Sequence, residues 1–285
     1  MASQLNGGIQ WCDVTWNPIR GCSMAKGSEL GGCLNCYAAR QASRFTGEGS
    51  PFAGFARVTE NGPRWTGKVE LVEKHLTDPL KWKAPRRVFV NSMSDLFHEA
   101  LHLAEIDRIF DVMERCPQHT FQVLTKRPGW MRHYMATMVT QRPSWPLPNV
   151  WLGVSVEDQA TAGARIPLLL RTPAAVRFVS YEPALGPVDW GHACVSDGAR
   201  AGLAALDWII VGGESGPGAR PFDVQWARDT VAQCRDAGVA CFVKQLGARP
   251  RGPEQSVPDW VSRLDRKGGN WEVWPDDLRV REFPT

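Results

Sequence analysis

Residues 150–155 read VWLGVS, a run in which apolar residues follow one another without the alternation that a half-exposed strand shows. Such a run is typical of a strand that is buried on both faces of a sheet. Five further runs have the same character, and they lie at residues 87–92, 120–125, 176–181, 208–212 and 239–244. We expect one more strand near residues 9–16, so the chain contains the strands of a large buried sheet.

Helical patterns separate these runs. Residues 104–115 place Ile106, Ile109 and Phe110 at helical spacing, and residues 226–237 show a similar pattern that stops at Gly238. Strands that alternate with helices form parallel sheets, because each helix returns the chain to the same end of the sheet. We therefore expect an α/β fold with a partial or full TIM-like (β/α) barrel of parallel strands.

The rest of the chain is organised around this barrel. We expect the barrel domain to cover residues 1–247, with a cysteine-bearing loop near the N-terminus and an exposed polar insertion near residues 47–64. Residues 248–285 are rich in Gly, Pro and Trp and show little periodicity. We expect them to form an ordered cap and not an independent domain.

The composition narrows the function classes. The 285 residues are 43% hydrophobic and 22% charged, which is typical of a soluble globular protein. No apolar run approaches the roughly 18 residues of a membrane span, and the N-terminus lacks the features of a signal peptide. We expect a cytoplasmic protein with reduced thiols and no membrane partner. The motifs of P-loop NTPases, HExxH metalloproteases and α/β-hydrolases are absent from the sequence.

Three cysteines form a C-x10-C-x2-C pattern: Cys22, Cys33 and Cys36. Three thiolates on a four-iron cluster leave one iron open for a substrate, whereas a structural zinc site normally takes four ligands. A fourth zinc ligand is available in the sequence from Cys12, His75 or His98. The spacing alone leaves iron–sulfur and zinc equally open, and buried cysteines without a metal are a third alternative.

Polar or charged side chains follow each of the six apolar runs. They are Asn91, Ser92, Asp95, Lys126, Ser155, Glu157, Glu182, Glu214 and Lys244. The C-terminal ends of parallel barrel strands meet on one face, and that face carries the active site of such barrels. Helix caps and solvated loops also begin at strand ends, so each residue has a structural alternative. As a set, we expect them to line one pocket beside the cysteines.

The net charge of +3 neither requires nor opposes a nucleic-acid partner. Residues 127–142 combine Arg127, Arg132 and Arg142 with Trp130 and Tyr134. This mixture suits contact with a nucleic-acid strand. It also suits a solvated helix with a buried aromatic face, which we favour.

The motifs in their order resemble those of a phage-associated family of radical S-adenosylmethionine (SAM)-like proteins. The motifs are TWNP at 15–18, CLNCYA at 33–38, NSMSDLF at 91–97, LTKRP at 124–128, GVSVE at 153–157, SYEP at 180–183, GGESG at 212–216 and FVKQ at 242–245. The resemblance covers nearly the whole chain. It implies a barrel of the radical SAM type.

The resemblance also implies a cofactor set. Cys22, Cys33 and Cys36 would hold a [4Fe–4S] cluster whose open iron binds the amino and carboxylate groups of SAM, which is cleaved reductively to a 5′-deoxyadenosyl radical. Tyr37 would lie near the adenine. Asn91, Ser92, Ser155 and Glu157 are candidates for SAM contacts. The candidates for the substrate side are Asp95, Lys126, Glu182, Glu214 and Lys244.

Some phage enzymes of this kind are isomerases of thymidine hypermodification. The resemblance therefore implies a DNA substrate, an amino-acid-modified thymine base, together with an electron donor such as flavodoxin and a place in the host cytoplasm. Two alternatives stay open. One keeps the cofactors but makes the reaction that of a lyase or repair enzyme on a nucleobase. The other is a zinc-stabilised barrel that binds nucleic acid or protein without catalysis.

Overall fold

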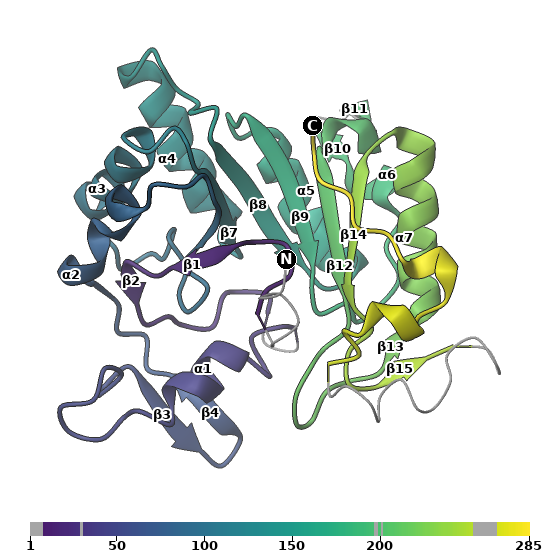
Figure 1. Ribbon diagram of the computed structural model, residues 1–285, viewed down its shortest axis with the longest axis horizontal. Coiled ribbons are helices and arrows are strands. Elements are labelled where there is room, and N and C mark those ends of the chain that lie inside the picture. Colours follow the sequence, from purple (N-terminus) through teal and green to yellow (C-terminus); the bar gives the residue numbers. More distant parts are fainter. Residues whose placement is uncertain (1–7, 29–30, 197–198, 201, 253–266) are drawn as a thin grey trace. The chain divides into compact units, whose positions relative to one another are not determined.

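The computed structural model describes residues 8–28, 31–196, 199–200, 202–252 and 267–285 (Figure 1). The chain divides into two compact units. The first unit comprises Met1–Glu29, Cys36–Leu152 and Thr172–Ala175, and the second comprises Leu30–Asn35, Gly153–Arg171 and Val176–Thr285. The extents that we expect for the barrel and for the C-terminal cap stay predictions.

The fold class is α/β, with the parallel sheet of a partial TIM-like barrel, as expected. Seven strands follow one another in the sheet in the order β1, β6, β7, β8, β9, β12 and β14. Their bounds are Val14–Trp16, Arg87–Val90, Thr120–Thr125, Val150–Val156, Val176–Tyr181, Trp208–Gly212 and Ala240–Gln245. Spatial order follows chain order throughout, which is the connectivity of successive right-handed β–α–β crossovers.

Helices α3 (Leu103–Glu114) and α4 (Pro128–Gln141) follow β6 and β7 in the first unit. An aromatic cluster forms between them, with ring centroids of Phe110 lying 5.1 Å from Tyr134 and 5.0 Å from Trp145. Within residues 127–142, Tyr134 is buried whereas Trp130 is 48% exposed, and the favoured interpretation of this stretch stays a prediction. Short helices α2 (Glu73–Leu76) and η1 (Asp78–Lys81) precede β6.

The N-terminal part of the first unit holds two small antiparallel pairs. Strand β2 (Ile19–Arg20) pairs with β5 (Glu70–Leu71), and β3 (Ala56–Thr59) pairs with β4 (Gly62–Trp65). The β3–β4 hairpin falls in the expected insertion, and α1 (Tyr37–Ala42) packs against β4. Figure 1 shows α1 lying across this hairpin.

The second unit surrounds β9, β12 and β14 with three helices, α5 (Gln159–Leu170), α6 (Trp190–Ala193) and α7 (Val224–Ala237). Helix α7 ends at Gly238, which adopts a left-handed φ of 69°, as the sequence predicts. The remaining elements are β10 (Val195–Ser196), β11 (Ala199–Arg200), η2 (Leu203–Ala205), β13 (Phe222–Asp223), β15 (Pro250–Arg251), η3 (Trp271–Val273) and η4 (Asp276–Leu278). In the described part of the chain, no helix is both long and apolar enough to cross a membrane.

Two strands differ from expectation by two residues or more, and β8 and β14 differ by one residue at one or both ends. The expected strand at 87–92 ends at Val90, because Asn91 turns the chain with a φ of 59°. Asparagine tolerates this left-handed conformation better than most residues, since its side chain can hydrogen-bond locally. The N-terminal strand is short and covers only Val14–Trp16 of the expected 9–16.

In the core of the second unit, the ring of Phe178 packs directly against the backbone of Gly153 in β8. A Cβ atom built on Gly153 would lie 2.6 Å from three carbons of the Phe178 ring, and Phe178 is fully buried. The ring therefore occupies the space that a side chain at position 153 would need.

We expect Gly153→Ala to lower the free energy of unfolding by about 1–3 kcal/mol, because the added methyl forces the buried ring from its place. Urea denaturation measures this change. Gly163→Ala is the matched control: Gly163 lies on exposed helix α5 with nothing within 4 Å of the added Cβ. It should raise stability slightly, by about 0.5–1 kcal/mol, as alanine is the better helix former. Equal effects of the two substitutions would contradict the packing argument.

Candidate functional site

The three motif cysteines differ from the other five in exposure. Cys22, Cys33 and Cys36 are partly exposed, whereas the remaining cysteines are all buried: Cys12, Cys116, Cys194, Cys234 and Cys241. Cys33 belongs to the second unit, and the other two motif cysteines belong to the first. Within the described ranges, no group of three or more His, Cys, Asp or Glu side chains is placed to hold a metal ion.

Arg127 organises the surroundings of Cys22 in the first unit. Its Nη1 lies 4.0 Å from the Cys22 Sγ and 3.0 Å from the Asp95 Oδ2. Its Nε donates to Glu99 at 2.8 Å, and its Nη2 donates to the Ser23 hydroxyl at 2.8 Å. Burial opposes the charge of this guanidinium, yet Asp95, Cys22 and Glu99 outweigh burial and raise its pKa. A permanent positive charge therefore faces the Cys22 sulfur.

Asp95 is fully engaged by its own unit. Its carboxylate accepts from the Thr125 hydroxyl at 2.7 Å, from the backbone N–H groups of Phe97 and Lys126 at 3.0 and 3.2 Å, and from Arg127. With 5% exposure and these four donors, the carboxylate has the environment of a structural anchor. These contacts join the ends of β6 and β7, and the expected substrate role of Asp95 stays a prediction.

His98 and Ser23 extend this network. The Nδ1 of His98 accepts from the Ala100 N–H at 3.1 Å, so the ring proton lies on Nε2, which donates to the Ser23 hydroxyl at 2.8 Å. Burial, and then the charge of Arg127, lower the pKa of His98 and keep the ring neutral. Both ring nitrogens are therefore occupied.

The two other candidates for a fourth zinc ligand also have partners. The Cys12 thiol donates to the Ile9 carbonyl at 3.6 Å, and the Nδ1 of His75 lies 2.9 Å from Asp78.

The residues that follow β6 hold the backbone together near Tyr37. The Asn91 Oδ1 accepts from the Ile19 N–H at 3.2 Å, and the Ser92 hydroxyl donates to the Asn17 Oδ1 at 3.1 Å. The Tyr37 hydroxyl donates to the Ser92 carbonyl, although Tyr37 as a whole is 52% exposed. These three sequence-predicted residues thus lie close together in the first unit.

Cys36 caps helix α1. Its Sγ accepts from the Ala39 N–H at 3.5 Å, in the position that a serine or aspartate oxygen usually takes.

In the second unit, Glu157 holds the loop that carries Cys33. Glu157 is completely buried, and its Oε2 pairs with Arg165 at 2.8 Å. Its Oε1 accepts from the Gly32 N–H at 3.3 Å. A buried carboxylate needs such compensation, because an unpaired charge in the interior is strongly unfavourable.

Glu214 holds the same loop from the end of β12. Arg220 binds it through two parallel contacts, Nη2 to Oε1 at 2.6 Å and Nε to Oε2 at 2.9 Å. Asn35 donates to Glu214 at 3.2 Å, and Arg220 donates to the Gly31 carbonyl at 3.0 Å. Burial would raise the pKa of the Glu214 carboxyl, but the hydrogen bonds from Arg220 and then from Asn35 outweigh it and lower the pKa.

Residues 31–35 are thus fixed on both sides of Cys33 by two carboxylates from strand ends. The contacts reach Gly32 before the cysteine and Asn35 after it. Both carboxylates thus support the loop, and the expected roles of Glu157 in SAM binding and of Glu214 in substrate binding stay predictions.

Glu182 and Lys244 form a third ion pair, with 2.8 Å between Oε1 and Nζ. Ser180 donates to the other oxygen of Glu182 at 3.2 Å. The glycine that follows β12's last apolar residue makes room for this carboxylate, since a Cβ on Gly212 would lie 2.8 Å from the Glu182 Oε1. Both side chains keep partial exposure, 13% for Glu182 and 18% for Lys244, whereas the Glu157–Arg165 pair is buried on both sides.

The strand-end residues therefore form separate groups within each unit. Asp95 lies with Arg127 in the first unit, where the Lys126 backbone joins them. In the second unit, Ser155 is buried, and its backbone carbonyl accepts from Arg165 at 2.8 Å. The common pocket that we expected from all six charged residues stays a prediction.

The pairing of these carboxylates with arginines is not among the expectations drawn from the sequence. Arg165 lies eight residues after Glu157 on α5, and Arg220 lies six residues after Glu214. A signal was present, because each buried strand-end acid needs a cation from the helix or loop that follows it. Lys126 and Arg127 are adjacent and carry the same charge. The sequence therefore did not indicate which of the two would form the ion pair with Asp95.

We expect Asp95→Asn to lower the free energy of unfolding by about 3 kcal/mol, because it leaves the buried Arg127 without its main counter-charge. Urea denaturation measures the loss. Glu99→Gln removes the other carboxylate of Arg127, but its side chain is 48% exposed. It should therefore cost under about 1 kcal/mol. An Asp95→Asn protein as stable as Glu99→Gln would contradict the anchoring role.

We expect Arg220→Met to release the Cys33 loop, since Glu214 then loses its bidentate partner and Gly31 loses a donor. Alkylation of the metal-free protein, followed by mass spectrometry, should show Cys33 reacting several-fold faster relative to Cys22. Arg228→Met is the control, because it breaks an ion pair of the same unit with Asp277. A uniform rise at every cysteine in both variants would mean general loosening and would oppose a specific tether.

The family of the chain follows from comparison with protein-family models. One model matches residues 6–273, which is most of the chain. The protein belongs to DUF5131. This family is described as comprising proteins of unknown function. A search of curated proteins and a search of solved structures found no match.

Proposed function

We propose that this DUF5131 protein is a radical SAM enzyme in which Cys22, Cys33 and Cys36 hold a [4Fe–4S] cluster. The observation that carries the proposal is the division of the cysteines by exposure: the three motif thiols are partly exposed, and the other five are buried. A solvent-accessible set of three soft sulfur donors fits the ligand chemistry of an iron–sulfur cluster. The order of sequence motifs adds support.

The immediate surroundings of the thiols also favour a metal-bound thiolate. Arg127 places a positive charge 4.0 Å from the Cys22 sulfur, and the Cys36 sulfur accepts a backbone N–H group at the start of α1. Hydrogen bonds and positive charge favour the thiolate form that ligates iron. When bound, the cluster would supply the electron that cleaves SAM.

The chain's own residues would divide the remaining work. Carboxylates Glu157 and Glu214 position the Cys33 loop through Gly32 and Asn35. Tyr37 is exposed and offers a stacking surface for an adenine. The Glu182–Lys244 pair is partly exposed and would bind polar groups of the substrate.

For the substrate we propose an amino-acid-modified thymine base in DNA, which the enzyme would isomerise with an electron donor of the flavodoxin type. Lyase or repair chemistry on a nucleobase would use the same cofactors and the same residues. Incubation of the reconstituted protein with modified DNA oligonucleotides, SAM and reductant, followed by mass spectrometry of the nucleosides, distinguishes these outcomes.

We expect anaerobically reconstituted protein to bind about four iron and four sulfide ions per chain. It should release 5′-deoxyadenosine from SAM when reduced. Each of Cys22→Ser, Cys33→Ser and Cys36→Ser should lose most of the iron, because a three-thiolate site cannot spare a ligand. Iron and sulfide analysis and the visible absorption spectrum measure the loss without reference to turnover.

Cys116→Ala and Cys12→Ala serve as controls, since both residues are buried and lie outside the motif. Both should keep the iron content of the parent protein. A colourless protein with one zinc ion, in which Cys12→Ala releases the metal as fully as the motif variants, would overturn the proposal in favour of a four-cysteine zinc site.

A further inference from the structure

The guanidinium of Arg127 is fixed in place by acceptors on a different segment of the first unit. Its Nη1 contacts Asp95 at 3.0 Å, and its Nε contacts Glu99 at 2.8 Å. Both carboxylates belong to the segment between β6 and α3, whereas Arg127 follows β7. Because the guanidinium is a rigid plane, these two contacts set its position independently of Cys22. Held in this way, Nη1 lies 4.0 Å from the Cys22 Sγ.

The remaining nitrogen of Arg127 holds the backbone beside that sulfur. Nη2 donates to the Ser23 hydroxyl at 2.8 Å and to the Ser23 carbonyl at 3.2 Å. The same hydroxyl lies 2.8 Å from the Nε2 of His98, so Ser23 is held from two sides. Since Ser23 follows Cys22 directly in the chain, these contacts fix the cysteine relative to the cation.

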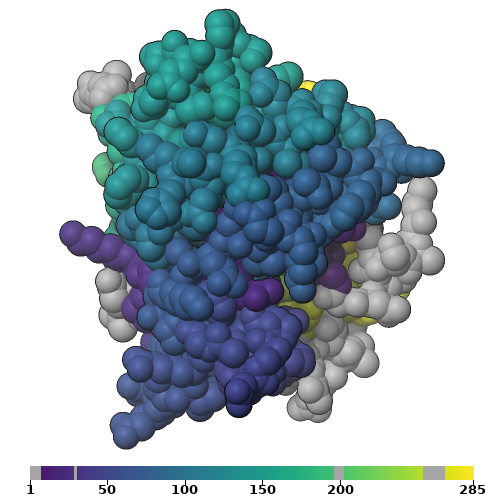
Figure 2. All heavy atoms as spheres, turned by 90° about the vertical axis from the view of Figure 1, so that its left-hand side faces the viewer, coloured from purple at the N-terminus to yellow at the C-terminus, as the bar shows by residue number. Residues whose placement is uncertain are grey.

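The charge of Arg127 is shielded from water. The side chain of Arg127 is 4% exposed, and that of Asp95 is 8% exposed. Figure 2 shows one face of the first unit, on which the blue atoms of the segments around β6 and α3 form a continuous layer. A charge that water does not screen acts more strongly on its neighbours than an exposed charge does.

The two carboxylates that bind Arg127 differ in how fully they balance its charge. Asp95 is buried, but its oxygens also accept from the Thr125 hydroxyl and from the backbone N–H groups of Phe97 and Lys126. The side chain of Glu99 is 48% exposed, so water screens part of its charge. The sulfur of Cys22 thus lies next to a cation whose charge is only partly balanced.

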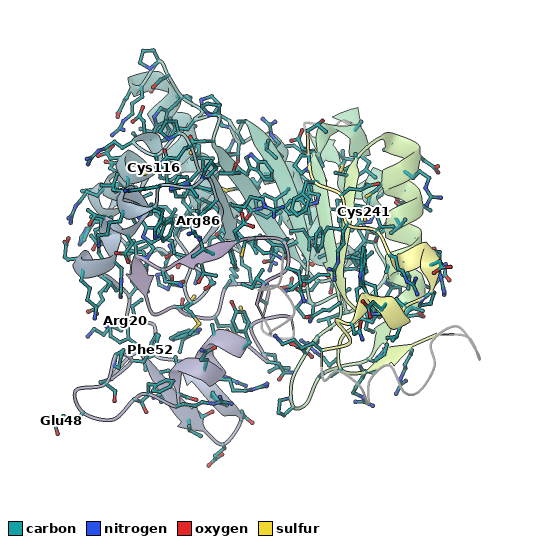
Figure 3. The ribbon with its side chains drawn as sticks, viewed as in Figure 1. Arg20, Glu48, Phe52, Arg86, Cys116 and Cys241 are labelled. Atoms are coloured by element: carbon teal, nitrogen blue, oxygen red, sulfur yellow. The ribbon has the colours of Figure 1, made fainter. Side chains whose placement is uncertain are left out.

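Cys116 provides a contrast within the same unit. It also has an arginine nearby, Arg115, but that arginine is exposed. Burial raises the pKa of the Cys116 thiol, and the charge of Arg115 opposes this effect without overcoming it. Figure 3 shows the labelled Cys116 among the side chains of the first unit. A partly exposed sulfur beside a buried, fixed cation is therefore a feature of Cys22 that Cys116 does not share.

A fixed cation at a ligand sulfur has a known effect on an iron–sulfur cluster. Reduction adds negative charge to the cluster and its thiolates, so nearby positive charge and hydrogen bonds to the sulfurs favour the reduced state. Arg127 offers both to the Cys22 sulfur.

We propose that Arg127 is a positioning residue whose charge, held against the Cys22 sulfur, raises the reduction potential of the cluster, and that Glu99 partly offsets this effect. The inference rests on the proposed function, because it requires a cluster on Cys22. In the reduction, the [4Fe–4S] cluster takes one electron from its donor and passes from the 2+ to the 1+ state. With Arg127 in place, a given donor reduces a larger fraction of the protein.

The test is an anaerobic redox titration of the reconstituted full-length protein without SAM. Dithionite is the reductant, and the electron paramagnetic resonance signal of the reduced cluster is the readout. Arg127→Met combined with Asp95→Asn removes the cation and its main counter-charge together, so that neither is left buried alone. The midpoint potential should fall by about 59 mV, which is a tenfold change in the equilibrium of one-electron reduction.

Glu99→Gln is the second variant, since it leaves Arg127 in place and removes only a half-exposed carboxylate. It should raise the midpoint potential, with a change of about threefold in the reduction equilibrium. Arg127→Lys keeps the charge and should stay closer to the parent protein than to the double variant. Glu73→Gln is the matched control, because it removes the same charge from an exposed carboxylate that pairs with Arg108. It should leave the equilibrium within about twofold.

Opposite shifts in the double variant and in Glu99→Gln support the proposal. Shifts in the same direction would overturn it, and so would equal effects of Glu99→Gln and Glu73→Gln, since net charge alone would then explain the potential. If the double variant takes up no iron, Glu99→Gln decides, and an unchanged midpoint in that variant contradicts the proposal.

Iron analysis separates this inference from the proposed function. A parent protein that binds no cluster refutes the proposed function and this inference with it. A parent protein with a full cluster, whose potential does not respond to substitution of Arg127 or Glu99, refutes this inference alone. Circular dichroism checks that each variant folds.

Discussion

A sheet buried on both faces has no place for a charge along its strands, and charge can enter only where the strands end. In this protein each acid at such an end is met by a cation close at hand: Asp95 by Arg127, Glu157 by Arg165, and Glu214 by Arg220. Desolvation makes these pairs obligatory, since any partner left alone would be a buried uncompensated charge. Members of these pairs also form hydrogen bonds to the surrounding loops. The loop that carries Cys33 is held in this way by Glu157, Glu214 and Arg220.

The pattern of apolar runs was enough to predict the sheet. Continuous apolar runs such as VWLGVS predict strands that are buried on both faces. Strand β8 contains this run and extends one residue beyond it, to Val156. The end of β6 could not be predicted in the same way, because it depends on the left-handed turn at Asn91 and on the acceptor that its side chain offers to Ile19. Hydrophobic periodicity does not predict a strand end of this kind, because the end depends on a hydrogen bond between one side chain and a backbone group far away in the sequence.

Candidate site residues were identifiable by type and position, but their partners were not. The sequence marks Glu157 and Glu214 as polar groups at strand ends, while nothing in it pairs them with Gly32 and Asn35, more than a hundred residues away. A carboxylate that supports a loop and one that binds a ligand have the same sequence signal. The two cases differ only in the contacts that each carboxylate makes, and such contacts are not visible in a sequence pattern.

The sulfur of Cys36 has a consequence for the helix that follows it. Because that sulfur accepts the Ala39 N–H, the first turn of α1 loses or keeps a hydrogen-bond acceptor according to what else the sulfur binds. Helix α1 has only six residues, so one capping contact is a large part of its local stability. The hydrogen-exchange protection of the Ala39 amide would therefore report the chemical state of the thiol. The same short helix packs against β4, so the chemical state of one sulfur atom has a short structural route to the β3–β4 hairpin.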